Sequence, residues 1–199
     1  MSRGWKMFLP EATGVNQTRC IWARNQPLSP TCCGLAAAHS LPHCGFMIPE
    51  RATNPALWPP ILGLLRDSFA FMEGRIDPPS SLRELTPGAL SRQAEIGEIW
   101  ILGPPLACVF MTPKPGVLYL GKLAVAAAHR GRGLARQLIE HAEARAAALR
   151  LPALELQTRV ELLENQAAFR AMGFVETART AHPGFDRPTS ITYRRTVAV

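Results

Sequence analysis

The stretch Leu118–Ile139 reads LYLGKLAVAAAHRGRGLARQLI and contains the most informative pattern of the chain. Its first part is an apolar run typical of a buried strand, and its last part carries apolar residues at helical spacing. Two glycines, Gly131 and Gly133, lie between the two parts. The sequence therefore predicts a strand that passes through a glycine-bearing turn into a helix.

Three arginines crowd the predicted start of this helix: Arg130, Arg132 and Arg136. A helix N-terminus already carries positive dipole charge, so each cation there costs about 0.3–1 kcal/mol. A bound pyrophosphate would neutralise the arginines and accept hydrogen bonds from the free N–H groups of the first turn. Such charge-assisted bonds contribute about 1.5–3 kcal/mol each, and the glycines let phosphates approach the backbone. We interpret the pattern as an anion site; the alternative is that the arginines only face solvent.

Two common nucleotide motifs do not fit this turn. A Walker A loop requires Lys followed by Ser or Thr directly after its last glycine, and Leu134 follows Gly133. A dinucleotide-binding fingerprint requires a third glycine where Arg136 stands. The anion is therefore held by a different kind of site.

The flanking sequence predicts one α/β (α+β) domain with a mixed sheet. Strands are predicted at 46–51, 98–102, 106–111, 117–125, 154–160, 174–180 and 189–197. Helices are predicted at 55–72, 81–93, 134–149 and 165–172, the last ending at a left-handed cap at Gly173. The first strands form a meander and a long helix joins later ones, so both antiparallel and parallel pairs are expected.

Two motifs resemble the GCN5-related N-acetyltransferase (GNAT) family. Arg130, Gly133 and Ala135 match its acetyl-CoA motif [QR]xxGx[GA] in register. Downstream, Phe169–Phe174 is similar to a second signature of that family, an aromatic residue four positions before Gly-Phe. The resemblance covers about residues 47–199.

The resemblance implies a GNAT-like, mostly antiparallel sheet of about six or seven strands, flanked by about four helices and splayed between the fourth and fifth strands. The pantetheine arm of acetyl-CoA would lie in that gap, and a backbone N–H near Leu123 would polarise the thioester carbonyl. The implied cofactor contacts are Leu123, Ala124, Val125, Arg130, Gly131, Arg132, Gly133, Leu134, Ala135, Arg136, Asn165 and Phe169.

Acetyl transfer requires a neutral amine, and an alkyl amine with a pKa near about 10.4 is mostly protonated at neutral pH. A proton acceptor is therefore needed, directly or through water. Glu155 is the first candidate, because it should face away from Leu154 and Leu156 on their strand; the alternative is that it pairs with an arginine. Glu73, in the polar loop at 73–81, is the second candidate.

The chain departs from the family at two positions. Phe169 stands where the family often has a tyrosine that protonates the departing sulfur. A thiolate with a pKa near about 8.5 leaves tolerably without a strong acid, so turnover does not require that tyrosine, and Tyr119, Tyr193 or water could serve instead. The family's asparagine often lies where this chain has Leu162, which leaves Asn165 a possible helix cap. Phe169 also keeps open a non-catalytic acetyl-CoA sensor.

The acceptor is expected to be a small-molecule or peptide amine, and its identity stays open. The loops at 73–81 and 182–190 are predicted to recognise it. Their charged residues could read a zwitterionic or carboxylate-bearing amine, or could be ordinary turn residues: Arg75, Asp77, Asp186 and Arg187.

Composition places the chain among ordinary globular proteins, with 47% hydrophobic and 19% charged residues. No apolar run approaches the about 18–20 residues of a membrane-spanning helix, and nothing reads as a secretion signal. We therefore expect a cytoplasmic protein with no membrane partner. The net charge of +7 is scattered, which argues against a nucleic-acid partner. The oligomeric state stays open, a homodimer included.

Residues 1–46 differ from the rest, because they carry four prolines and no sustained hydrophobic period. They predict a disordered or loosely attached extension ahead of a domain at 47–199. Their cysteines lack the paired spacing of zinc ligands, so no metal site is predicted: Cys20, Cys32, Cys33 and Cys44. We also hypothesise that the natural product starts at Met47; N-terminal sequencing that finds residues 1–46 intact would end this idea.

Overall fold

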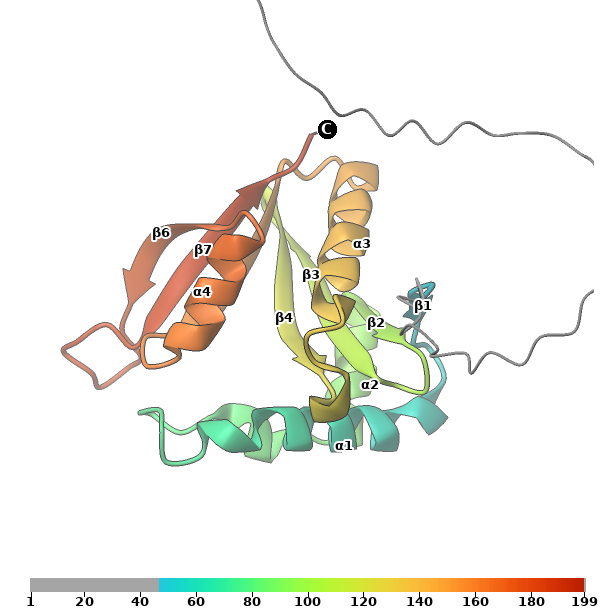
Figure 1. Cartoon of the computed structure of the whole chain (residues 1–199), viewed down its shortest axis with the longest axis horizontal. Coiled ribbons are helices and arrows are strands. Elements are labelled where there is room, and N and C mark those ends of the chain that lie inside the picture. Colours follow the sequence, from blue (N-terminus) through green and yellow to red (C-terminus); the bar gives the residue numbers. More distant parts are fainter. Residues whose placement is uncertain (1–46, 199) are drawn as a thin grey trace, which may run out of the picture. The chain divides into compact units, whose positions relative to one another are not determined.

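The sheet has seven strands in the order β1-β2-β3-β4-β5-β7-β6 in the computed structural model, which describes residues 47–198 (Figure 1). The strands are β1 (Glu50–Arg51), β2 (Glu98–Leu102), β3 (Ala107–Lys114), β4 (Val117–Val125), β5 (Ala153–Arg159), β6 (Val175–Thr180) and β7 (Ser190–Thr196). All neighbouring pairs are antiparallel except β4 and β5, which run parallel. The predicted extension at residues 1–46 lies outside the described residues.

Helices cover both faces of this sheet. They are α1 (Trp58–Phe69), α2 (Pro87–Ile96), α3 (Leu134–Ala148) and α4 (Leu163–Ala171). Successive residues of β3 divide between two apolar clusters, since side chains alternate along a strand. Val109 and Met111 pack with residues of α3, whereas Cys108 and Phe110 pack with residues of α1 and α2. The central strand β3 is therefore buried on both faces, whereas the edge strands β1 and β6 are exposed.

The parallel pair of strands is short. Leu118, Tyr119 and Leu120 of β4 pair with residues 154–156 of β5, and no pairing follows beyond Leu120. In Figure 1, β4 and β7 are close at one end and diverge toward the end occupied by α1. The sheet thus opens into a wedge between its fourth strand and the strands that follow.

The structure confirms the predicted fold class, a mixed sheet with a parallel pair between the fourth and fifth strands. One predicted helix, at 81–93, is wrong in its extent. It is divided into a short turn at Ser81–Glu84 and α2, because Thr86 caps α2 by accepting from the Ala89 N–H and Pro87 takes its first position. The apolar periodicity continues across Thr86 and Pro87, although these two residues mark the start of a new helix.

The last helix begins earlier than predicted. α4 starts at Leu163, so Asn165 lies inside it and is not its N-cap. The predicted C-terminal cap is confirmed, since Gly173 has φ of +83° and the Phe174 N–H donates to the Phe169 carbonyl at 3.1 Å. Cys108, which the sequence places in an apolar strand, is fully buried, and burial raises the pKa of its thiol to about 12.

A charged cluster connects β2 to α3. Arg145 donates two hydrogen bonds to the Glu98 carboxylate, one of them from Nε at 3.0 Å, and the Trp100 indole donates to Glu98 at 2.7 Å. Burial alone would raise the pKa of Glu98, but these hydrogen bonds and the positive charges of Arg145 and Arg51 outweigh it. The pKa of Glu98 is therefore below its usual value.

Replacing Glu98 by Gln should lower the free energy of unfolding at pH 7 by about 1–2 kcal/mol, because charge-assisted hydrogen bonds are lost. The folded-state pKa of Glu98 lies below the unfolded value of about 4.3, so its contribution is present above that value and disappears as the pH falls through the folded-state pKa. Urea unfolding of both proteins between pH 3 and about 7 measures the difference. Glu176→Gln is the matched control, because its pair with Arg179 is exposed; a control loss equal to that of Glu98→Gln would contradict the assignment.

Candidate active site

The glycine turn delivers α3 with an open N-terminus. Gly131 and Gly133 have φ of +74° and +79°, a conformation that other residues rarely adopt. Gly133 is the N-cap and no side chain caps the helix. The first turn contains no acidic residue, so no carboxylate of that turn accepts from its free N–H groups. Backbone N–H groups gathered in this way are suited to bind an anion.

The arginines of this turn divide into two kinds. Arg132 and Arg136 are exposed and form no ion pair within residues 47–198. The Arg130 guanidinium instead donates to the carbonyls of Val125, at 3.3 Å, and Ser68, at 3.1 Å. Arg130 thereby fastens the turn to the end of β4 and to α1, and the contact with an anion predicted for it stays a prediction.

β4 is irregular where it leaves β5. Its register with β3 shifts between Cys108 and Phe110, and Lys122 opposite this shift has φ of +52°. A bulge of this kind bends the strand and leaves backbone groups unpaired. Leu123 and Ala124, two of the predicted pantetheine contacts, follow it on the edge of β4 that has no β5 partner.

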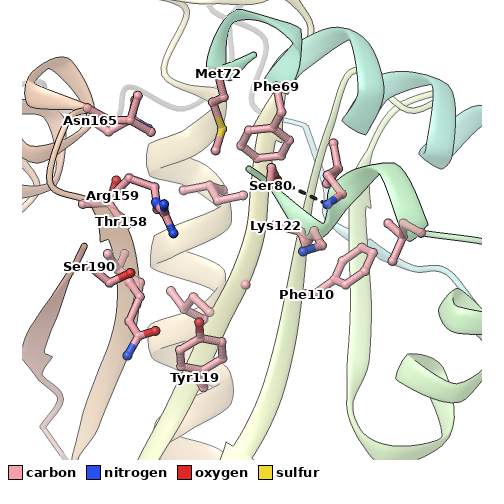
Figure 2. A pocket seen from close by; sticks show the side chains of 18 of the residues that line it. Phe69, Met72, Ser80, Phe110, Tyr119, Lys122, Thr158, Arg159, Asn165 and Ser190 are labelled. Carbon is pink, nitrogen blue, oxygen red and sulfur yellow. Dashed lines mark hydrogen bonds between the residues drawn. The ribbon is translucent and has the colours of Figure 1, made fainter. Parts of the chain in front are cut away.

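A cavity of about 500 Å³ occupies the wedge between β4 and β5 (Figure 2). One wall is apolar and comes from α1, the loop after it, α2 and β3: Phe69, Met72, Leu82, Leu85, Ala89 and Phe110. The strands and α4 supply hydroxyl and amide groups: Thr112, Tyr119, Gln157, Thr158, Asn165 and Ser190. Among the lining residues, the charged ones are Lys122 and Arg159, and none is acidic.

The sequence profile of the acetyltransferase (GNAT) family matches residues 71–174, just over half of the chain. This chain belongs to the GNAT acetyltransferase family. The matched range contains the open α3 start, the bulge in β4 and most of the cavity lining. Comparison with curated protein sequences gives no match.

Solved GNAT structures share this fold. A GNAT-family acetyltransferase from Staphylococcus aureus Mu50 is 14% identical with a TM-score of 0.60, over 77% of this chain and 100% of that one. Ard1 from Thermoplasma volcanium is 13% identical with a TM-score of 0.60, over 76% and 98%. A chain of the NatC complex bound to Gag peptide and CoA is 20% identical with a TM-score of 0.54, over 76% and 99%. The chain therefore has the fold of acyl-CoA N-acyltransferases.

Two of the three predicted catalytic residues of this GNAT domain are neighbours, since Tyr119 of β4 pairs with Glu155 of β5, whereas Glu73 belongs to a separate loop. Tyr119 lines the cavity. The Glu155 carboxylate is bonded by Arg194, at 2.8 Å from Nε and 2.7 Å from Nη2, which is the pairing that the sequence left as the alternative. Glu73 lines a second cavity of about 310 Å³, beside Arg66 and Ile76. Their catalytic roles stay predictions.

The predicted cofactor contacts of α4 both line the main cavity. Asn165 and Phe169 lie on the same side of α4, and the Phe169 ring packs 6.1 Å from Phe174 and 6.2 Å from Tyr193. Tyr193 is fully buried and does not line the cavity. Tyr119 is thus the tyrosine that the GNAT cavity contains.

The charged residues of the two predicted acceptor loops are mostly paired. Arg75 contacts Glu164 of α4 at 2.8 Å, and Arg187 contacts Asp77 at 3.2 Å. These ion pairs connect the loop at 73–80 to α4 and to the loop between β6 and β7. None of these four residues lines the cavity, and their charges are already balanced before a substrate arrives.

Sequence reasoning missed Lys122 and Arg159. Lys122 interrupts an otherwise apolar strand, and this was a usable signal, since a charged residue inside an apolar run needs a polar environment. Arg159 is close to the predicted end of its strand and has the spacing of an ordinary solvent-facing residue. Only the fold brings it across from Lys122.

The pair Gly133→Glu and Gly133→Ala tests the anion site. Both introduce a Cβ at φ of +79°, where no heavy atom lies within 4 Å, so both carry the same backbone strain. Only glutamate adds bulk and negative charge at the α3 start. We expect acetyl-CoA to bind Gly133→Glu at least about tenfold more weakly than Gly133→Ala, or about 1.4 kcal/mol, by isothermal titration calorimetry. Equal dissociation constants would remove the α3 start from the cofactor site.

Proposed function

We propose that the protein is an acetyl-CoA-dependent N-acetyltransferase that moves the acetyl group to a primary amine by direct attack in a ternary complex. The observation that carries this proposal is the cavity between β4 and β5, which opens where the two strands cease to pair. Family membership supports the reaction class.

Acetyl-CoA suits the hydrogen-bonding groups that are left open at the α3 start and at the end of β4. Its pyrophosphate suits the open α3 start, with Arg132 and Arg136 beside it. Its pantetheine arm carries amides, which suit the unpaired edge of β4 at residues 123–125 as an additional strand would. The thioester then reaches the cavity between Leu123 and the start of α4.

The transfer itself is an addition followed by elimination. The lone pair of the neutral amine attacks the thioester carbonyl, a C–N bond forms, the C–S bond breaks, and CoA leaves as the thiolate. A backbone N–H at the β4 bulge, near Leu123, would stabilise the oxyanion that develops. The amine loses one proton and the thiolate gains one.

The proton of the amine needs an acceptor, and the cavity lining supplies no carboxylate. We propose that the proton leaves through water that lies along the polar side chains of Gln157 and Thr112. Glu155 remains the first predicted base, with its carboxylate bonded by Arg194. Glu73, from the adjacent cavity, is the second.

Tyr119 is our proposed donor to the departing thiolate. It lines the cavity, and burial together with the negative charge of Glu155 raises the pKa of its hydroxyl. A raised pKa keeps the phenol protonated at neutral pH, as an acid requires. Phe169, at the family's usual tyrosine position, has no proton to give.

Tyr119→Phe should lower kcat about tenfold and leave acetyl-CoA affinity within about twofold, because a thiolate of pKa near about 8.5 leaves moderately well without an acid. Thiol release measures kcat and calorimetry measures affinity. Tyr193→Phe is the matched control, since Tyr193 is the other tyrosine of the chain and lies outside the cavity. An unchanged kcat in Tyr119→Phe would eliminate this donor.

A non-catalytic acetyl-CoA sensor is the second candidate, and the observation that favours it is Phe169 in place of tyrosine. The two functions separate when the purified protein is given acetyl-CoA and a panel of primary amines. Amine-dependent release of CoA thiol supports the transferase. Tight acetyl-CoA binding without release across the panel supports the sensor.

A further inference from the structure

Lys122 is a cation without a counterion in the cavity wall. Its side chain is half-buried at the β4 bulge, and burial lowers the pKa of its amine. No carboxylate within residues 47–198 forms an ion pair with it. A desolvated charge of this kind is costly unless a partner of opposite charge arrives.

Arg159 stands across the cavity from Lys122 (Figure 2). Its side chain is 11% exposed, and one Nη donates to the Pro78 carbonyl at 2.7 Å. Its Nε atom is buried and has no hydrogen-bond partner within the described residues, since Glu161 is 3.9 Å away. The other Nη lies 3.0–3.1 Å from the ring nitrogens of His182, and the Glu161 carboxylate balances part of the charge, so the protein itself holds the guanidinium in place.

The acyl donor does not supply the missing negative charge. The acetyl group and the pantetheine arm are uncharged, and the phosphates of CoA belong to the α3 start in the proposed complex. The anion that balances Lys122 must therefore arrive with the other substrate.

The apolar lining of the cavity indicates which other group the acceptor carries besides its anion. Phe69, Met72, Leu82, Leu85 and Phe110 form an apolar surface on the side of α1 and α2. Since no lining residue is acidic, an acceptor that carries several positive charges would meet no complementary charge in the lining and would be repelled by Lys122.

On the basis of the proposed acetyl transfer, we propose that the acceptor is a small primary amine that carries a carboxylate and an apolar group, as an apolar α-amino acid does, and that Lys122 binds its carboxylate. Arg159 faces the same space and adds positive potential. The apolar group packs against the wall formed by α1, α2 and Phe110. Specificity then comes from one charge contact and one apolar contact.

The test compares L-phenylalanine with L-phenylalaninamide, which differ only at the carboxyl group, and adds spermidine as a polycation. We expect kcat/KM for the acid to exceed that for the amide and for spermidine at least tenfold. The amine of the amide loses its proton more easily, and this difference by itself favours the amide. A preference for the acid therefore has to overcome it. A preference for the amide or for spermidine, with CoA release intact, would overturn the inference and leave the proposed transferase standing.

Variants of the wall assign the contact. In Lys122→Gln the acid should lose its tenfold preference through a raised KM, and Lys122→Arg should keep it, since the charge is retained. Lys114→Gln is the matched control, because Lys114 lies over the Tyr119 ring, 3.7 Å from its centre, without lining the cavity. A full preference retained in Lys122→Gln would show that another group reads the carboxylate.

A binding measurement keeps this inference separate from turnover. Calorimetric titration of the CoA-loaded protein with L-phenylalanine and its amide should show at least tenfold tighter binding of the acid, and this difference should disappear in Lys122→Gln. If acid and amide bind equally, the inference fails even where acetyl transfer is observed. If the acid binds selectively but no amine releases CoA, the carboxylate site stands and the proposed transfer fails.

Discussion

The structure depends on one interrupted set of hydrogen bonds, the parallel pairing of β4 and β5 that ends after Leu120. A longer pairing would close the sheet and fill the space with backbone, leaving no room between the strands. The bulge at Lys122 bends β4 at this point. The apolar cluster on the α3 face contains residues of β4, β5 and β7, so it spans the opening and holds the two parts of the sheet together.

The fold was largely predictable from the sequence, because its signals are local. Short apolar runs located β2 and β4, and the glycines at 131, 133 and 173 located the start of α3 and the end of α4. The failures are local as well. Helical periodicity continued through Thr86 and Pro87, although that pair starts a new helix, and the start of α4 at Leu163 has no capping side chain to announce it.

The candidate site was only partly predictable, for a physical reason. The open α3 start is a property of consecutive residues, so charge and glycine spacing revealed it. The cavity lining is assembled from segments between Phe69 and Ser190, and strand alternation does not say which polar residue meets which partner. Glu155 illustrates this, since its partner Arg194 comes from β7, which follows β5 in the sheet but not in the chain.

The loop at 73–80 is attached by contacts of unequal strength. Arg75–Glu164 and Asp77–Arg187 link it to α4 and to the β6–β7 loop through side chains that are all about half exposed to solvent. Exposed ion pairs contribute little stability and weaken as salt screens them. The Arg159 guanidinium, whose side chain is only 11% exposed, donates to the Pro78 carbonyl of the same loop at 2.7 Å. Raised salt concentration should therefore loosen the outer contacts of this loop and leave its attachment at Pro78 in place.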